Sequence, residues 1–579
     1  MLFRSKKKRP IMGETAEKYS DYMIITSDNP RTEDPDLIID DIIDGLNGTT
    51  PYIREADRKR AIMRAITMAK PGDVVLLLGK GHETYQVLGN NKISFDERII
   101  VSKITKNYKA NLFDGSLKES MTIDEIARAV GGDLSGCSDI ADKKIAARDI
   151  FSDTRKPIKD GLFIAIKGDN FDGHDFSASA VKGGAAAAVT DHAVEGLPCI
   201  VVKDTRAALL KLAAYFREKF SPIVIGITGS VGKTTTKEMT AVALSGGRSV
   251  FRSGKNFNNE IGLPFQVFKL NRSVTAAVLE MGMSNLGEIE RLSKTGCPDI
   301  CVVTNIGWSH IENLGSRKNI LKAKLEILAG AKKHAPLILN GDDKLLSEII
   351  NNYPERRVIT YGIDFKRADY KAVDIEYYTD RSIFKIVKGG REIAEVVLYC
   401  FGRHNILNAL CAVTVAAESG CDPAFAASLL SGYSVSDMRQ EIKVSNGHTL
   451  ILDCYNASPD SMKAAIDVLT EMPVKQGGRR IAVLGDMLEL GEFSKTLHEQ
   501  IGEYISTKNI DILFCYGQNS KYIAWTANIE SKIKSIYSSD KTYISDYLRS
   551  MAKPGDIILF KASRGMKLEE IALDFQIDN

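Results

Sequence analysis

Short apolar runs alternate with segments of helical periodicity along almost the whole chain. Runs such as "PIVIGIT", "TAAVLE" and "DICVVT" are buried-type strands, and helical patterns separate them. Strands joined by helices in this way are typical of parallel α/β layers, so the pattern predicts the α/β fold class.

The alternating pattern divides into four blocks. We predict a short α/β unit over residues 1–106, a polar linker over 107–120, and further blocks over 121–221, 222–434 and 435–579. In the first unit, the helix "READRKRAIMRAITMA" lies between strands near "DYMIITSD" and "DVVLLLG".

The hexapeptide Met-Ala-Lys-Pro-Gly-Asp occurs twice, starting at Met68 and at Met551. In each copy a helical pattern leads into the Pro-Gly turn, and an apolar strand follows. The last block also has the strand "RRIAVLG", which has no counterpart in the first block. The first block is therefore predicted to be a truncated copy of the last domain.

Composition narrows the class of protein. The 579 residues are 44% hydrophobic and 26% charged, as in ordinary globular proteins. No apolar run is long enough to span a membrane, and the start "MLFRSKKKRP" lacks a signal peptide's apolar segment, so we expect a cytoplasmic protein without membrane insertion. A net charge of +3 gives no argument for a nucleic-acid partner, and the nine Cys residues form no CxxC pairs.

The segment "PIVIGITGSVGKTTT" predicts a phosphate-binding loop. A strand, a Gly-rich turn and a helix starting at Lys233 direct backbone N–H groups at phosphate. Lys233 is placed to reach the β- and γ-phosphates, and the Thr234 hydroxyl to reach Mg²⁺. Ile227 occupies the place of the first Gly of the general pattern, so Thr228–Thr235 is a shorter variant.

Two further strands end in polar residues suited to the same site. In "VTAAVLEMG" the apolar run leads to Glu280, and in "DICVVTNIGWSH" it leads to Asn305 and His310. Ligands of open parallel sheets bind at the carboxyl ends of the strands, so we expect these side chains near the phosphate loop. A carboxylate and an imidazole there suit metal binding and charge stabilisation.

Lys324 lies in an unusual position on the predicted helix "GSRKNILKAKLEILAGAKK". At 100° per residue it falls near the centre of the apolar arc, whereas Lys322 and Glu326 fall on the polar side as an ordinary surface pair. A buried lysine is costly unless its charge is paired, its pKa shifts or it is modified. The alternative is a lysine whose ammonium reaches water.

The motifs from residue 121 onward resemble those of the Mur ligase family of peptidoglycan synthesis. The shared segments, in chain order, are "TGSVGKTT", "NFNNEIGLP", "EMG", "TNIGWSH", "AKLEIL", "GRHNILNAL" and "LDCYNASPDSM". The resemblance implies a uridine-nucleotide-binding domain, a central P-loop ATPase domain and a Rossmann-like C-terminal domain. Within the family, "SDTRKPIKDGLFIAIKGDNFDGHDF", "NNEIGLP" and "GDMLELG" are most similar to members that join D-alanyl-D-alanine to UDP-N-acetylmuramoyl-tripeptide.

The resemblance implies roles for individual residues. The catalytic set is Lys233, Glu280, His310 and Lys324, with Lys324 matching a lysine that CO₂ converts to a carbamate. The implied ATP-binding residues are Gly229, Ser230, Val231, Gly232, Lys233, Thr234, Thr235, Asn408, Arg439, Asp453 and Asn456. The implied Mg²⁺ ligands are Thr234, Glu280, His310 and carbamylated Lys324. Thr154, Arg155 and Asn259 are candidate contacts to the nucleotide substrate.

The mechanism that the resemblance implies is ATP-dependent amide formation. The γ-phosphate is transferred to the terminal carboxylate of the tripeptide, and the amine of D-alanyl-D-alanine attacks the acyl phosphate and releases phosphate. The implied partners are these two substrates, and association with other cell-wall ligases is a further expectation. Another amide ligase of the superfamily, such as folylpolyglutamate synthase, remains the alternative activity.

The first block resembles a different Mur ligase, the one that adds the third amino acid of the peptide. Its segments "SDNPRTEDP" and "LLLGKGHETYQ" match a pocket for meso-diaminopimelate. The residues that this resemblance assigns to the pocket are Asp28, Asn29, Pro30, Arg31, Gly79 and Glu83. The block has no phosphate loop, so we expect either an inert remnant or a non-catalytic binding module.

Overall fold

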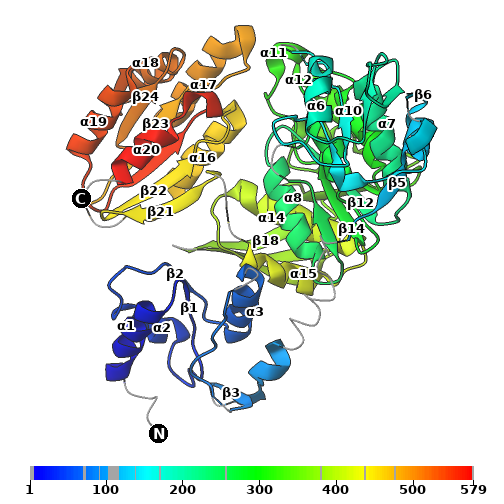
Figure 1. The fold of residues 1–579 in the computed structure, drawn as a ribbon. Helices are drawn as coiled ribbons and strands as arrows, with labels where there is room; N and C mark the ends of the chain where they lie inside the picture. Colours follow the sequence, from blue (N-terminus) through cyan, green and yellow to red (C-terminus); the bar gives the residue numbers. More distant parts are fainter. Residues whose placement is uncertain are drawn as a thin grey trace.

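Parallel strands joined by helices make up most of the chain, as the alternating pattern predicts (Figure 1). The computed structural model describes residues 6–69, 73–81, 83–89, 91–101, 117–136, 138–168, 171–254, 257–378, 381–433, 435, 438–474, 477–531 and 533–576. Within these ranges, no helix combines the length and apolar character needed to cross a membrane. Most of the predicted linker, residues 107–116, lies outside the described residues.

The largest sheet follows the phosphate-loop motif and has the strand order β13-β14-β12-β15-β16-β17-β18-β19-β20. Its pairs are parallel from β13 to β18 and antiparallel from β18 to β20. Its elements are β12 (Ile223–Thr228), α8 (Lys233–Leu244), β13 (Val250–Arg252), α9 (Gly262–Val267), β14 (Ala276–Glu280), α10 (Glu288–Gly296), β15 (Ile300–Val303), α11 (Ile311–Leu314), α12 (Arg317–Leu325), β16 (Leu337–Asn340), α13 (Lys344–Ser347), β17 (Val358–Gly362), β18 (Tyr370–Tyr377), β19 (Ser382–Lys388), β20 (Arg391–Leu398), α14 (Arg403–Glu418) and α15 (Pro423–Leu429). Strands β14, β15 and β16 are buried along their whole length, as expected for parallel strands covered on both faces.

A smaller sheet precedes it, with the order β6-β11-β10-β9-β8. The elements of this region are β5 (Ser120–Thr122), α5 (Ile123–Val130), β6 (Asp133–Ser135), β7 (Lys144–Ala146), β8 (Ile150–Phe151), β9 (Leu162–Ile164), α6 (Ser177–Lys182), β10 (Ala187–Thr190), β11 (Cys199–Val201) and α7 (Thr205–Glu218). The predicted helix at "TIDEIARAVGG" is confirmed as α5. A capping box between Thr122 and Glu125 fixes its start, and Gly131 ends it in the left-handed conformation.

The last sheet has the order β21-β22-β26-β23-β24-β25. Its elements are β21 (Glu441–Ser445), β22 (His448–Asp453), α16 (Pro459–Glu471), β23 (Arg480–Gly485), α17 (Ser494–Ser506), β24 (Ile512–Tyr516), α18 (Ser520–Glu530), β25 (Lys534–Ser538), α19 (Lys541–Met551), β26 (Ile557–Lys561) and α20 (Glu569–Gln576). Strand β26, which follows the second Met-Ala-Lys-Pro-Gly-Asp copy, lies between β22 and β23 and is parallel to both.

The first block contains a two-stranded parallel sheet, β1-β2, and a two-stranded antiparallel sheet, β3-β4. Its elements are α1 (Arg9–Tyr19), β1 (Met23–Ile25), α2 (Pro35–Ile43), β2 (Tyr52–Arg54), α3 (Arg58–Met68), β3 (Tyr85–Leu88) and β4 (Asn91–Ser94). The strand predicted at "DVVLLLG" is wrong, because residues 73–79 form no strand. Its counterpart β26 is held by β22 and β23, and no strand pairs with residues 73–79 among the described residues of the first block.

The first block packs against the outer edge of the central sheet, near α15 (Figure 1). The Tyr399 hydroxyl donates to Glu55 at 2.7 Å, and the Arg64 guanidinium lies 3.3 Å from the centre of the Tyr399 ring. Arg60 pairs with Glu395 at 2.6 Å. Burial raises the pKa of Tyr399, which is consistent with a well-covered interface.

Candidate active site

The phosphate-loop motif forms a turn between β12 and α8. The Asn305 side-chain oxygen accepts from the backbone N–H groups of Ser230 and Val231, at 3.1 and 2.8 Å. Asn305 follows β15, which pairs with β12, so the register of these two strands places its amide under the loop. The expected convergence of Asn305 on the loop is confirmed.

Helix α8 begins at Lys233, and no side-chain hydrogen bond caps its N-terminus. The first N–H groups of a helix lack partners within it, so this end presents donors and a positive dipole to an anion. The Lys233 ammonium folds back over the loop and donates to the Gly229 carbonyl at 2.7 Å. Burial lowers the pKa of Lys233, and the Glu280 carboxylate acts in the opposite direction.

Asn408, on α14, lies directly beside the loop. Its side-chain oxygen accepts from the Thr236 hydroxyl at 3.1 Å. Gly232 has φ 82°, and a Cβ atom there would lie 2.7 Å from that same oxygen. The sequence "GRHNILNAL" is therefore positioned against the phosphate loop even though almost 180 residues separate them along the chain.

Thr234 and Glu280 meet at the carboxyl end of β14. The Thr234 hydroxyl donates to Glu280 at 2.9 Å, and the Asn258 amide donates to the other carboxylate oxygen at 2.8 Å. Lys237 is fully buried, with its ammonium 3.7 Å from Glu280 and 3.2 Å from Glu238. The sequence analysis predicts no role for Asn258 or Lys237. Asn258 lies in "NFNNEIGLP", and Lys237 directly follows the phosphate-loop motif, but only the fold shows that both side chains lie near Glu280.

A hydroxyl and a carboxylate are oxygen ligands of the kind that Mg²⁺ prefers. Asn258→Ala is expected to raise the Mg²⁺ concentration for half-maximal activity about tenfold, because a hydrogen bond to a charged group contributes about 1.5 kcal/mol. The measurement is a Mg²⁺ titration of turnover. Asn285→Ala, which removes an exposed amide that donates to Glu288, is the matched control. Unchanged Mg²⁺ dependence in Asn258→Ala would contradict this role.

Lys324 is buried on α12, with only 1% of its surface exposed. Burial lowers its pKa well below the usual value, and the nearby Lys233 ammonium lowers it further. Within the described part of the chain, no hydrogen bond or ion pair involves the Lys324 amine. The structure thus favours a buried amine over a lysine whose head reaches water. Its neighbour Glu326 does not pair with Lys322 but accepts from the Gly287 N–H at 2.8 Å, at the start of α10.

His310 was expected beside Glu280 as a Mg²⁺ ligand, but in the structure it contacts Glu489 instead. Its ring nitrogen Nδ1 lies 3.0 Å from Glu489, which follows β23 in the last domain, and this contact lowers the pKa of Glu489. Among the described residues, no hydrogen bond or ion pair links His310 or Lys324 to Glu280. The structure therefore brings together Thr234 and Glu280 of the predicted metal ligands, while His310 joins two domains.

Of the predicted ATP-binding residues of the last domain, Arg439 precedes β21, Asp453 ends β22 and Asn456 follows β22. Asp453 pairs with Lys561 at 2.9 Å, and the Lys561 ammonium also donates to the Asn456 carbonyl at 2.7 Å. The Arg439 guanidinium lies 3.9 Å from the centre of the Tyr455 ring, and it also lowers the pKa of Lys233. Arg439 is therefore within electrostatic reach of the phosphate loop.

Asp460, at the start of α16, brings the last domain against the central one. Its carboxylate accepts from the Trp308 N–H at 3.2 Å, and a Cβ atom on Gly307 would lie 2.1 Å from it. Burial raises the pKa of Asp460. The contact lies next to Ser230, whose hydroxyl accepts from the Gly307 N–H at 2.8 Å. The two domains therefore meet at the phosphate loop.

Among the described residues, no hydrogen bond or ion pair links the side chains of the three candidate substrate residues. Arg155 is exposed and pairs with Asp153 at 2.9 Å. Asn259 accepts from the Gly262 N–H at 2.7 Å, at the start of α9. Thr154 is half-buried between β8 and β9.

The predicted pocket of the first block is assembled from two distant segments. Asn29 donates to Glu83 at 2.9 Å, and Asp28 accepts from the buried Lys80 at 2.7 Å. Arg31 is exposed and has φ 55°, and its N–H donates to the Val87 carbonyl at 3.1 Å. Pro30 is buried, and Gly79 has φ 110°. The "DNPR" and "GKGHE" segments therefore lie together, as the resemblance implies.

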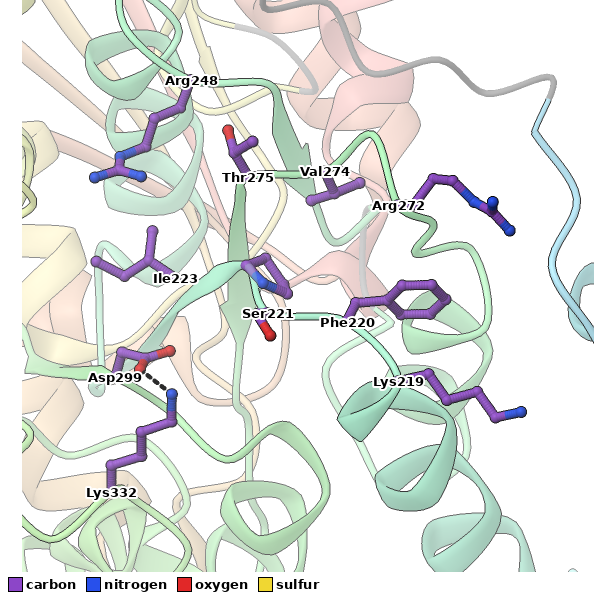
Figure 2. Close-up of a pocket in the computed structure, with 11 residues that line it drawn as sticks. Lys219, Phe220, Ser221, Ile223, Arg248, Arg272, Val274, Thr275, Asp299 and Lys332 are labelled. Carbon is purple, nitrogen blue, oxygen red and sulfur yellow. Dashed lines mark ion pairs between the residues drawn. The ribbon is translucent and has the colours of Figure 1, made fainter.

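A cavity of about 640 Å³ lies away from this site (Figure 2). It is lined by Ile223, Thr275 and Asp299, which stand at the amino ends of β12, β14 and β15. The phosphate loop follows the carboxyl end of β12, so the cavity lies at the opposite end of the sheet. None of the predicted site residues lines it.

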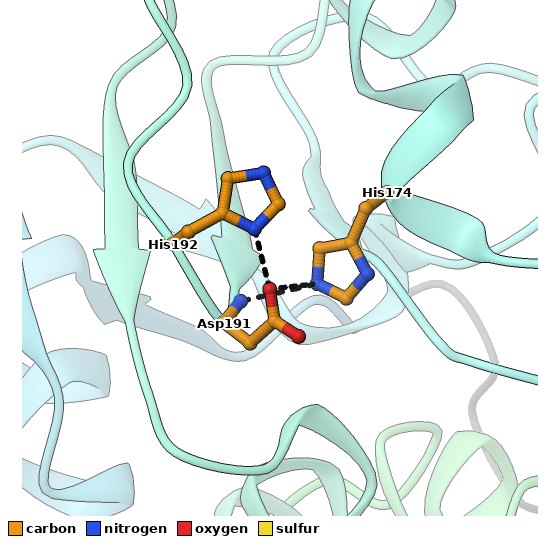
Figure 3. Close-up of side chains that lie close together, drawn as sticks. All are labelled: His174, Asp191 and His192. Atoms are coloured by element: carbon orange, nitrogen blue, oxygen red, sulfur yellow. Dashed lines mark hydrogen bonds and ion pairs between the residues drawn. The ribbon is translucent and has the colours of Figure 1, made fainter.

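His174, Asp191 and His192 gather on the smaller sheet with their nitrogen and oxygen atoms within 4.8 Å of one another (Figure 3). His174 Nε2 accepts from the Asp191 N–H at 3.1 Å, while Nδ1 lies 2.5 Å from Asp172. With the proton on Nδ1, this nitrogen donates to Asp172, and both ring nitrogens of His174 are then engaged in hydrogen bonds. This arrangement leaves His174 no lone pair for a cation.

Sequence models of the family cover most of the chain. The Mur ligase middle domain matches residues 227–416, and the Mur ligase family catalytic domain matches residues 152–217. The Mur ligase glutamate ligase domain matches two separate ranges, residues 1–81 and 438–564. The first block is thus of the same domain type as the last one, as the repeated hexapeptide indicates.

Individual relatives agree with the domain matches. The UDP-N-acetylmuramoyl-tripeptide--D-alanyl-D-alanine ligase of Bacillus subtilis is 42% identical over 460 residues, which cover 78% of this chain and 98% of the relative. A crystal structure of MurF from Acinetobacter baumannii has a TM-score of 0.73 and 29% identity, covering 80% of this chain and 100% of its own. The MurF ligase from Thermotoga maritima in complex with ADP has a TM-score of 0.67 and 31% identity, and the match covers 74% of this chain and 96% of the Thermotoga chain. With three-domain architecture, phosphate loop and relatives in agreement, the chain belongs to the Mur ligase family.

Proposed function

We propose that this protein joins D-alanyl-D-alanine to UDP-N-acetylmuramoyl-tripeptide at the expense of ATP. The observation that carries the proposal is the assembly of Lys233, Thr234, Glu280 and Asn408 around an uncapped helix N-terminus. The B. subtilis relative of that activity matches along 98% of its length. Other amide ligases of the superfamily use the same kind of ATP-binding site. The proposed substrates therefore rest on the similarity to the relatives, and the proposed use of ATP rests on the geometry of the site.

The loop and α8 hold the phosphates of ATP. Backbone N–H groups at the start of α8 and the Lys233 ammonium offset the negative charge of the γ-phosphate as it moves to the tripeptide carboxylate. Thr234 and Glu280 would hold Mg²⁺, which when bound neutralises the crowded phosphate and carboxylate oxygens. Asn258 and Lys237 keep the Glu280 carboxylate oriented.

Lys324 is proposed to act as a carbamate. Burial and the nearby Lys233 ammonium lower the pKa of Lys324 well below its usual value, which favours the neutral amine, the form that adds CO₂. The carbamate would carry a negative charge beside the Lys233 ammonium, so the two groups would attract each other. A modified Lys324 would then be a further oxygen ligand for Mg²⁺, and His310 would join it after the domains move.

The last domain completes the site from the opposite side. Arg439 approaches the phosphates, and Asp453 at the end of β22 and Asn456 after it contact the nucleotide. The contact of Asp460 with the Gly307–Trp308 turn holds this domain against the loop and limits the access of water to the acyl phosphate. Thr154, Arg155 and Asn259 are proposed to contact the uridine-nucleotide substrate.

Phosphate release tests the proposed activity. We expect turnover only when ATP, Mg²⁺, the tripeptide nucleotide and D-alanyl-D-alanine are all present, because the acyl phosphate needs both the carboxylate and the amine. Equal phosphate release without the dipeptide would contradict the proposal. Turnover with a folate and glutamate, but not with the peptide substrates, would instead support the folylpolyglutamate alternative.

The first block is proposed to derive from the ligase that adds the third amino acid, with Arg31 gripping a free carboxylate of meso-diaminopimelate. Titration of the full chain with meso-diaminopimelate should release heat that Arg31→Ala abolishes. Arg98→Ala, which removes an exposed arginine paired with Asp96 in the same block, is the control. The same heat from the wild type and Arg31→Ala would contradict the assignment.

A chain that starts at residue 117 is expected to keep its ligase activity. Every proposed ATP and Mg²⁺ contact comes from Gly229 or a later residue, and the first block packs on the far edge of the central sheet. Its removal uncovers Tyr399 and Leu429, so the melting temperature should fall while turnover stays the same. Loss of turnover in the folded shorter chain would show that the first block contributes to catalysis.

A further inference from the structure

The cavity of about 640 Å³ at the amino ends of β12, β14 and β15 lies where two domains join. Part of its wall is formed by residues 219–222, the segment that connects α7, next to the smaller sheet, to β12 of the central sheet. The rest of the wall comes from the central domain. Small-molecule sites in proteins measure about 300–1,000 Å³, so this cavity has room for an organic ligand rather than for a single ion.

Positive charge dominates the lining of this cavity (Figure 2). Arg248 and Lys332 stand on one side of it, and Lys219 and Arg272 stand on the other. Among the described residues that line the cavity, Asp299 is the one carboxylate. Several cations around one concave surface attract anions to it.

The Asp299 carboxylate is already engaged by cations and by a backbone donor. One of its oxygens lies 2.5 Å from the Lys332 ammonium. The other accepts from the Val224 N–H at 2.8 Å and lies 3.5 Å from the Arg217 guanidinium. The negative charge of Asp299 is therefore offset, and the cavity stays attractive to an anion.

Two of the other cations have carboxylate partners. Arg272 pairs with Glu119 at 2.8 Å, and its side chain is 76% exposed. Lys219 pairs with Glu125, and both side chains reach solvent. Ion pairs that are open to solvent contribute little to stability, so either cation can turn toward a bound anion at small cost.

Arg248 has the most binding capacity left. It lies between α8 and β13, and its Nη2 donates to the Ser419 carbonyl. Among the described residues, no carboxylate forms an ion pair with Arg248. A planar guanidinium binds phosphate oxygens through two parallel hydrogen bonds, so Arg248 is suited to hold a phosphate group.

We propose that this cavity binds a small molecule with two or more phosphate groups. The cations on its two sides call for anionic groups at two places, and a single phosphate ion is too small to reach both in a cavity of this volume. Phe220, Pro222 and Val274 give the wall apolar surface for the organic part of the ligand. The site lies at the opposite end of β12 from the phosphate loop, and its existence does not depend on the proposed ligase activity.

The probe for this site is inorganic tripolyphosphate, titrated by calorimetry into the full chain without Mg²⁺. The chain is first saturated with ADP to fill the phosphate loop, and this ADP titration reports separately on the proposed nucleotide site. We expect saturable binding of one tripolyphosphate per ADP-saturated chain. Absence of binding to the ADP-saturated chain would overturn the proposal, whether or not the ADP-free chain binds the probe.

Three variants test the position of the bound anion. Arg248→Gln and Lys332→Gln should each weaken tripolyphosphate binding at least tenfold and leave ADP binding unchanged. Ser221→Trp, which fills the cavity without changing its charge, should weaken it to a similar extent. Unchanged binding in any of these three variants would place the anion outside the cavity and overturn the proposal.

Lys294→Gln is the matched control. Like Lys332, Lys294 is an exposed lysine paired with one carboxylate, here Glu290 at 2.6 Å, but it does not line the cavity. Its substitution should leave tripolyphosphate binding unchanged. A loss of binding equal to that of Lys332→Gln would show a general effect of surface charge and would also overturn the proposal.

Discussion

Lys324→Ala is expected to lower ligase turnover at least about 10³-fold, because it removes the only proposed source of a carbamate at the site. Short carboxylic acids such as formate and acetate should restore part of the activity to this variant by replacing the lost carboxylate. Turnover is measured with and without added acid.

Two further variants separate the carbamate from a purely cationic role of Lys324. Lys324→Arg keeps a positive charge but cannot form the carbamate, so it should be as inactive as Lys324→Ala. Lys322→Ala, on the exposed side of the same helix, should be fully active. Full activity of Lys324→Arg, or of Lys324→Ala without added acid, would contradict the carbamate.

Lys233→Met is expected to have an effect of similar size for a different reason. Removal of the ammonium leaves the moving γ-phosphate with less positive charge, and comparable phosphate contacts contribute about 10³-fold or more to turnover. The variant should also bind ADP more weakly than the wild type, as measured by calorimetry.

The control for this substitution is Lys322→Met, which removes an exposed lysine and should bind ADP normally. Carboxylic acids that rescue Lys324→Ala should not rescue Lys233→Met, because the lost charge is of the opposite sign. Retention of wild-type turnover by Lys233→Met would contradict the placement of the phosphates on the loop.

Local patterns predicted the parts of the site that depend on neighbours along the chain. The phosphate loop follows from glycine spacing and the strand and helix on either side of it. The burial of Lys324 follows from the helical period, since six apolar residues share its arc. Asn305 could be predicted near the loop because polar residues at the carboxyl ends of parallel strands meet at one edge.

Contacts between distant segments could not be predicted in this way. Asn258 and Asn259 are adjacent and chemically identical, and only the path of the chain decides that Asn258 faces Glu280. His310 pairs with Glu489 because the last domain rests against the central one, and this placement has no local signal. Lys561 and Lys237 are buried by tertiary packing alone.

The first block shows the limit of strand prediction from apolar residues. "DVVLLLG" is as apolar as "DIILFK" of β26, yet it is not a strand in the structure. A strand is defined by its hydrogen-bonded neighbours, and the described part of the first block pairs no strand with this segment, whereas β22 and β23 hold β26. The repeated hexapeptide predicted the shared domain type, which the matches to residues 1–81 and 438–564 confirm.

Isotope transfer tests the central claim most directly. The tripeptide nucleotide is prepared with both oxygens of its terminal carboxylate as ¹⁸O, and the products of a complete reaction are analysed by mass spectrometry. Ligation through an acyl phosphate predicts a pentapeptide nucleotide that retains one ¹⁸O and released phosphate that contains the other. Phosphate without ¹⁸O, or phosphate release without the pentapeptide nucleotide, would contradict the account.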